Sequence, residues 1–152
     1  MTGGVTPRGL VPAVALALAV AARAPLAAQV DGTLAVGDSV RDSLTAQSRR
    51  LPAERTYARE WGFRGAAGET VTIDVASDAF DAYVFLLGPG FDATPPQDDD
   101  SGGRCNARLA VRLPQSGDYI IVVTSTDQDA IGPFTLGLRA GVRPPGLAPC
   151  RR

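Results

Sequence analysis

Hydrophobic and polar residues alternate along most of the chain after Gly32, with a period of two rather than the helical 3.6. In the segment ETVTIDVAS, for example, Val71, Ile73 and Val75 share one face, and polar side chains occupy the other. The segments ARLAVRLP and GPFTLGLRA alternate in the same way. This alternation is typical of strands with one buried and one solvated face. The pattern therefore predicts half-buried strands in all three segments.

Three further segments complete the predicted set of strands. AYVFLLGP and DYIIVVTST are apolar on both faces, which predicts central strands covered on both sides. TYAREWGFRG places Tyr57, Trp61 and Phe63 on one side, although Arg59 interrupts that face. With a first strand in DSVRDSL and no helical stretch, we expect an all-β fold: an antiparallel, jelly-roll-like β-sandwich of about seven to eight strands.

The N-terminal residues have the order of a secretory signal peptide. Arg8 supplies the positive charge, Leu10–Ala22 is an apolar run, and the small residues Ala27 and Ala28 follow. The run has 13 residues, and a membrane-spanning helix needs about 20. We expect cleavage after Ala28, with an N-terminal membrane anchor as the alternative. An exported protein follows, either secreted, periplasmic or in the cell envelope, without a stable membrane span in its mature form.

The remaining chain divides into one predicted domain and a tail. Residues 29–140 are enough for a single hydrophobic core, and residues 141–152 are rich in proline and glycine without a strand pattern. After removal of Arg8 and Arg23, 13 arginines remain against 16 acids, a net charge near −3. A mildly acidic exported domain has no electrostatic attraction to nucleic acid, so we expect no nucleic-acid partner.

The composition removes several catalytic chemistries. The chain has no histidine, which excludes a Ser-His-Asp triad, a Cys-His pair and histidine-ligated zinc. It also has no lysine, which excludes a Schiff-base nucleophile. Carboxylates, hydroxyls and arginines remain, so a carboxylate-based hydrolase is the only enzymatic alternative. We expect no enzymatic activity.

The segment PPQDDDSGGRCN holds a candidate metal site at Asp98, Asp99 and Asp100. Calcium binds six to eight oxygen ligands, and carboxylates in a flexible turn can supply some of them. The alternative is a solvated turn whose side chains cap backbone amides. Asp81 begins the strand that leads into this loop, so an extended chain would place it about 20 Å away unless the chain folds back. Calcium is the one cofactor that the sequence suggests.

Cys105 and Cys150 are the two cysteines of the chain. In an exported protein an even number of cysteines favours a disulfide, here between the acidic loop and the tail. We expect this bridge to be the only restraint on the tail, because the tail is poor in apolar residues and its prolines lack amide donors.

Two other features carry alternatives. Trp61 is a core residue or a platform for a sugar ring, and its place on an alternating strand favours the core. Arg108, Arg112 and Arg139 form either a stripe for an anionic polymer or a solvated strand face, and the second interpretation is the simpler one.

Six segments in fixed order resemble the bacterial pre-peptidase C-terminal domain family: GDSVRDSL, TYAREWGFRGAAGETVTIDV, FDAYVFLL, DDDSGG, LPQSGDYIIVVTS and GPFTLGL. The resemblance spans about Val30 to Arg139. It implies an exported, jelly-roll-like β-sandwich that accompanies secreted hydrolases and aids secretion, solubility or substrate binding, and related collagen-binding modules bind calcium. Asp98 stands where the family's loop has asparagine, no peptidase precedes the segment, and the family pattern does not require the two cysteines.

Together these observations predict a non-catalytic exported accessory or binding domain. Its expected ligand is an extracellular protein or polysaccharide. A structural or secretion-assisting module without a specific ligand is the alternative, and the carboxylate-based hydrolase is a third.

Overall fold

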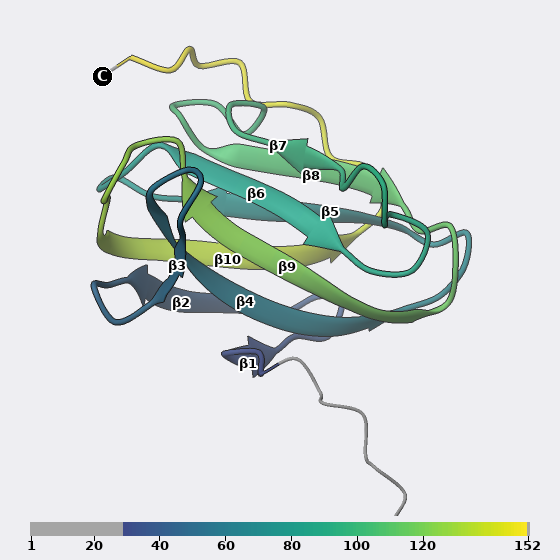
Figure 1. The fold of residues 1–152 in the computed structure, drawn as a ribbon. Coiled ribbons are helices and arrows are strands. Elements are labelled where there is room, and N and C mark those ends of the chain that lie inside the picture. Colours follow the sequence, from purple (N-terminus) through teal and green to yellow (C-terminus); the bar gives the residue numbers. More distant parts are fainter. Residues whose placement is uncertain (1–28, 152) are drawn as a thin grey trace, which may run out of the picture.

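The computed structural model describes residues 29–151, which form two β-sheets packed face to face as a sandwich (Figure 1). The predicted signal peptide, residues 1–28, lies outside the described residues. Every regular element in the described part of the chain is a strand, so no helix there could cross a membrane. The predicted all-β sandwich is confirmed.

The first sheet has six strands in the order β1-β4-β9-β6-β7, with β3 also paired to β4. All pairs are antiparallel except β1 with β4. The bounds of its strands are β1 Gly32–Thr33, β3 Arg49–Leu51, β4 Thr56–Gly65, β6 Ala82–Leu87, β7 Gln97–Asp98 and β9 Gly117–Ser125.

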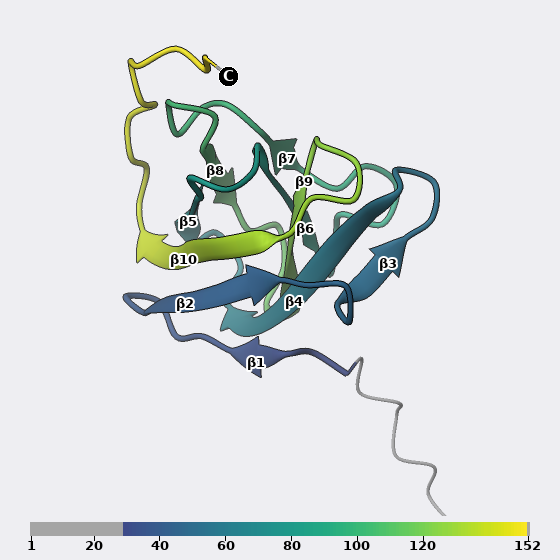
Figure 2. The ribbon, with the colours of Figure 1, turned by 90° about the vertical axis from the view of Figure 1, so that its left-hand side faces the viewer.

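The second sheet has four strands in the order β2-β10-β5-β8, all antiparallel. Their bounds are β2 Ser39–Leu44, β5 Thr70–Ala76, β8 Ala107–Arg112 and β10 Gly132–Ala140. Figure 2 shows the strands β2 and β10 in one layer, with β4 beside β2 at one side of the sandwich.

The described residues contain ten strands, rather than the seven to eight that the sequence predicts. Seven of the ten correspond to the predicted segments. The other three, β1, β3 and β7, have two or three residues each. A segment this short cannot display a period of two, so its pairing is visible only in the fold.

The core lies between the two sheets and is built from the apolar positions of the alternating strands. Val111 of β8 and Trp61 of β4 are only partly buried and pack against this cluster. The buried positions include Val71, Ile73, Leu109, Ile121, Val123, Phe134 and Leu136.

The two strands predicted to be covered on both sides differ in their outer faces. In β9, the outward Val122 and Thr124 are buried, whereas Ile120 on the same face is half-buried. In β6, Ala82, Val84 and Leu86 are buried in the core, but the alternate residues on the opposite face are only half-buried. The prediction of full cover was therefore wrong for β6, since within residues 29–151 Tyr83, Phe85 and Leu87 stay half-buried on that face.

Candidate functional site

Asp98, at the end of β7, uses both oxygens of its carboxylate within the fold. Its Oδ2 accepts hydrogen bonds from the backbone N–H groups of Ser101 (3.0 Å) and Arg108 (2.8 Å). Its Oδ1 accepts a hydrogen bond from the Ser101 hydroxyl. Because Arg108 lies in β8, this carboxylate joins the acidic loop to the four-stranded sheet. Asp98 thus caps backbone amides, which is one of the two roles that the sequence left open for the loop.

The structure brings Asp81 next to the acidic loop. The strand β7 runs antiparallel to β6, with Val84 opposite Asp98, so the chain returns towards the start of β6. Carboxylate oxygens of Asp81 and Asp100 lie within 4.8 Å of each other. The separation of about 20 Å expected for an extended chain does not apply, because the chain folds back.

Beside the acidic loop, the oxygen ligands for a metal ion come from two carboxylates, those of Asp81 and Asp100. The sulfur atoms of Cys105 and Cys150 lie in the same group, but they are joined in a disulfide. Calcium requires six to eight oxygen ligands, so Asp81 and Asp100 would supply only part of a coordination shell. Calcium binding at Asp98, Asp99 and Asp100 stays a prediction. Of these three residues Asp100 lies in the group with Asp81, Asp99 lies outside it, and the oxygens of Asp98 already accept three hydrogen bonds.

The disulfide between Cys105 and Cys150 confirms the predicted bridge, with 4.4 Å between the two Cα atoms. It is not the only restraint on the tail. The backbone N–H of Arg104 donates to the carbonyl oxygen of Ala148 (2.9 Å), and Gly146 donates to a carbonyl of the acidic loop (2.7 Å). The expectation of a tail held by the bridge alone was wrong, because glycine and alanine residues between the prolines supply backbone partners.

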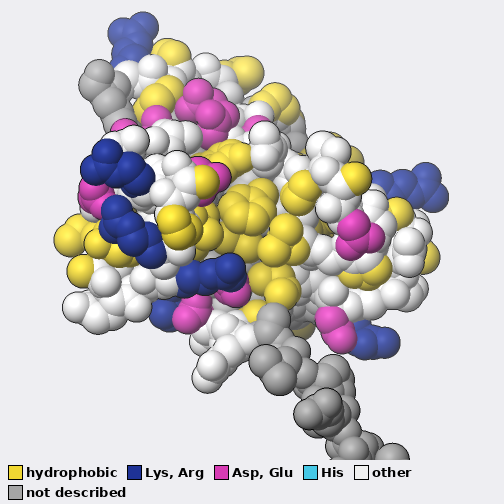
Figure 3. Space-filling view, viewed as in Figure 1, with side chains coloured by type: hydrophobic (Ala, Val, Ile, Leu, Met, Phe, Trp, Pro, Cys, Tyr) yellow, Lys and Arg dark blue, Asp and Glu magenta, His cyan; other side chains and the backbone are white. Residues whose placement is uncertain are grey.

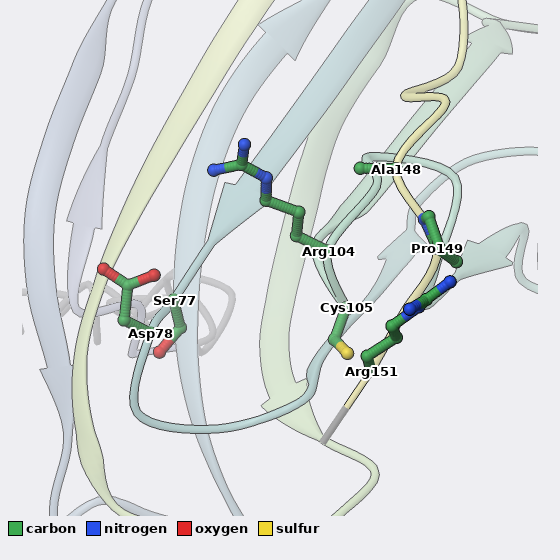
Figure 4. A pocket seen from close by; sticks show the side chains of 7 residues that line it. All are labelled: Ser77, Asp78, Arg104, Cys105, Ala148, Pro149 and Arg151. Carbon is green, nitrogen blue, oxygen red and sulfur yellow. The ribbon is translucent and has the colours of Figure 1, made fainter.

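A pocket of about 470 Å³ lies beside the disulfide (Figure 4). Ser77, Asp78, Arg104 and Arg151 line it together with Cys105 and tail residues. The side chains of Arg104 and Arg151 extend in different directions (Figure 4). The two guanidinium groups therefore do not converge on one point, as a site for a single anion would require.

Trp61 is part of the packing of the sandwich. It is partly buried against the core, and its indole N–H donates to Asp42 Oδ2 (3.2 Å). The strand β1 covers the ring closely: a Cβ atom on Gly32 would lie 2.3 Å from it. A ring held from two sides does not offer the open face that stacking on a sugar needs.

The predicted arginine stripe is largely engaged within its own sheet. Arg108 forms an ion pair with Asp74 (2.5 Å). Arg139 donates a hydrogen bond to the carbonyl oxygen of Asp38 (2.8 Å). Two of the three arginines therefore have partners within the sheet, and Arg112 is the third. This arrangement agrees better with a solvated strand face than with a row of free cations.

The outer face of the six-stranded sheet carries an apolar surface that the sequence did not reveal as exposed. Tyr83, Phe85 and Leu87 of β6, Ile120 of β9 and Leu51 of β3 are all half-buried there. We call these five residues the outer face. Figure 3 shows hydrophobic side chains gathered in the centre of this side of the molecule, with charged side chains around them. The sequence signal was the apolarity of both faces of β6, which resembles that of a fully covered strand.

A pocket of about 250 Å³ lies in the outer face, and we call it the outer-face pocket. Its lining residues are Leu51, Glu54, Tyr83, Phe85, Pro95 and Gln97. The Tyr83 hydroxyl donates to Gln97 Oε1 (2.6 Å), and the rings of Tyr83 and Phe85 are 6.1 Å apart. Burial, and then the negative charges of Asp99 and Glu54, raise the pKa of Tyr83 above its usual value. The pocket is therefore apolar at its base and acidic at its rim.

The neighbouring acids Asp81 and Asp100 are not arranged like a hydrolytic site. A glycoside hydrolase places two carboxyl groups on either side of the bond that it cleaves. Asp81 and Asp100 are near each other, but they line neither the pocket beside the disulfide nor the outer-face pocket.

No protein-family model and no curated protein matches this sequence. Solved structures do match its fold. One is the pre-peptidase C-terminal domain of a collagenase from Bacillus anthracis, with a TM-score of 0.55 and 13% identity over 72% of this chain and 96% of that chain. Another is PliG from Aeromonas hydrophila, a periplasmic inhibitor of g-type lysozyme, with a TM-score of 0.50 and 20% identity over 70% of this chain and 88% of that chain. The fold is thus similar to that of pre-peptidase C-terminal domains.

Proposed function

We propose that this protein is a non-catalytic, exported binding domain of the pre-peptidase C-terminal type, and that it binds a protein partner through the outer face. The observation that carries the proposal is the apolar, half-exposed side of β6. An apolar patch with a polar rim on a soluble protein marks an interaction site more often than it marks packing. Aromatic residues such as Tyr83 and Phe85 are enriched at the centres of protein interfaces.

A protein partner fits this surface better than a polysaccharide. Sugar rings stack on flat aromatic faces, but the planes of Tyr83 and Phe85 are inclined by 47° to each other. Trp61, the only tryptophan, is packed under β1. The lysozyme inhibitor with a similar fold binds a protein, which supports the use of this fold for protein recognition.

The absence of catalysis is supported by composition and by geometry. The chain lacks the histidine and lysine on which most nucleophilic mechanisms depend. The neighbouring acids Asp81 and Asp100 stand outside the two pockets described above. The protein thus acts by binding.

Export is supported by the signal-peptide pattern and by the disulfide, since disulfides persist in oxidising compartments outside the cytosol. We expect the mature protein to begin near Gln29. N-terminal sequencing of protein recovered from the periplasm or the culture medium tests this processing. A chain that still begins at Met1 would contradict it.

Affinity capture with matched surface variants tests the binding proposal. The exported protein is immobilised, envelope and secreted proteins of the source cells are passed over it, and each retained protein is purified and its affinity measured by calorimetry. Phe85→Arg places a charge in the centre of the outer face. Ala110→Arg makes a similar change at an exposed position of β8, in the other sheet.

We expect Phe85→Arg to weaken the binding of the partner at least tenfold, and Ala110→Arg to leave it unchanged. A partner that binds both variants with the same affinity would show that the outer face is not the site. Retention of a polysaccharide rather than a protein would support the alternative ligand. If no ligand is retained, the structural or secretion-assisting role is the better interpretation.

A further inference from the structure

The outer-face pocket has the size of a single long side chain. Its volume of about 250 Å³ lies below the range of about 300–1,000 Å³ that is usual for small-molecule sites. Its apolar base comes from Leu51 in β3, from Tyr83 and Phe85 in β6, and from Pro95 in the connection to β7. Because three separate elements form it, the pocket is set by the fold and is present before any ligand arrives.

Two acids border this base without any ion-pair partner among residues 29–151. Glu54 lines the pocket directly. Asp99 lies in the bend directly after β7, whose residue Gln97 lines the pocket. Both carboxylates are exposed, and both are near enough for their charge to act on the Tyr83 phenol. Neither forms a hydrogen bond or an ion pair within the described part of the chain.

The arginines on the same side of the molecule already have acidic partners. Arg49 forms an ion pair with Glu60. Arg50 and Arg55 share the carboxylate of Asp129, at 2.6 and 3.8 Å. The charge that the pocket itself offers to a partner is therefore negative.

Resting on the proposed function, we infer that the outer-face pocket receives a lysine or arginine side chain from the protein partner. The aliphatic part of such a side chain packs on the apolar base, as long cationic side chains do at interfaces. Its charged end then lies between Glu54 and Asp99, next to the aromatic ring of Tyr83, which adds a cation–π attraction. An acidic side chain would be repelled by the rim, and an aliphatic one would leave both carboxylates without a partner.

Titration with a defined peptide pair tests this inference. The probes are the blocked pentapeptides Gly-Gly-Lys-Gly-Gly and Gly-Gly-norleucine-Gly-Gly, which differ in the charged amino group. Binding to the isotope-labelled exported protein is followed by changes in amide NMR signals. We expect saturable shifts for Leu51, Tyr83 and Phe85 with the lysine peptide, and weaker binding of the norleucine peptide.

Charge variants locate the effect. The double variant Glu54→Gln with Asp99→Asn should lower the affinity for the lysine peptide about threefold to tenfold, the range expected for two exposed ion pairs. Its affinity for the norleucine peptide should stay unchanged. The control, Asp78→Asn with Asp118→Asn, removes two exposed charges elsewhere and should change neither affinity. All four positions are exposed, so both double variants are expected to fold.

Three results would overturn the inference. They are equal binding of the two peptides, equal weakening by the control variant, and no shift at the outer-face pocket at millimolar peptide. Equal binding would contradict a basic side chain but leave the outer face as an apolar docking surface, which capture with Phe85→Arg tests separately. A partner that is unaffected by Phe85→Arg would instead contradict the proposed function itself.

Discussion

Replacing Asp98 by alanine should destabilise the sandwich, whereas the same change at Asp99 should not. The two residues are adjacent in sequence and each variant loses one negative charge. Asp98 accepts three hydrogen bonds, from two backbone N–H groups and one hydroxyl. Within residues 29–151, Asp99 accepts none. The difference between the two variants therefore isolates the hydrogen bonds from the change in net charge.

The size of the effect follows from the kind of bond. A hydrogen bond to a charged group contributes about 1.5–3 kcal/mol, less where water competes for the acceptor. Asp98 is half-buried, so we expect a total loss of about 2–4 kcal/mol for Asp98→Ala. Asp98→Asn keeps one acceptor oxygen and should lose less. Asp99→Ala should stay within about 0.5 kcal/mol of the unchanged protein, as surface substitutions usually do.

Urea unfolding followed by circular dichroism measures these differences. The free energy of unfolding is extrapolated to water for each variant, with a chelator present so that divalent ions do not contribute. An unchanged denaturant slope would show that the variants unfold from comparable structures. If Asp98→Ala and Asp99→Ala have the same free energy of unfolding within about 0.5 kcal/mol, the capping role of Asp98 is refuted.

Three further predictions concern the disulfide, calcium and one tyrosine. Replacing Cys105 and Cys150 by alanine should lower the free energy of unfolding by up to about 4 kcal/mol, the chain-entropy value for the 45-residue separation. Circular dichroism should still show a folded sandwich, and loss of the strand signal would contradict this. If calcium binds, it should raise the melting temperature, and Asp81→Asn with Asp100→Asn should remove the shift, so an identical shift in the variant would exclude the pair. Tyr83 should ionise above about pH 10 in an absorbance titration, because its folded-state pKa is raised; its contribution to stability is present below that pH and is lost as the pH rises through the raised pKa. A titration that Tyr83→Phe leaves unchanged would contradict the assignment.

Local patterns in the sequence determined most of the fold. The seven longer strands follow from local patterns, either alternation or, in β6 and β9, continuous apolar runs, because these patterns depend only on the residues within one segment. The disulfide was also predictable, since an exported chain with two cysteines has one intramolecular pairing available. These predictions required composition and local order, and no knowledge of how distant segments pack.

Only the tertiary structure decided which apolar surface stays uncovered. The sequence of β6 is apolar on both faces, and whether a second layer covers the side with Tyr83 and Phe85 depends on where the other strands lie. The same holds for the acidic loop: Asp81 meets Asp100 because β7 folds back on β6, and Asp98 caps a donor ten residues away. A strand fixes the direction of its side chains locally, but the neighbours of those side chains come from chain segments that only folding brings together.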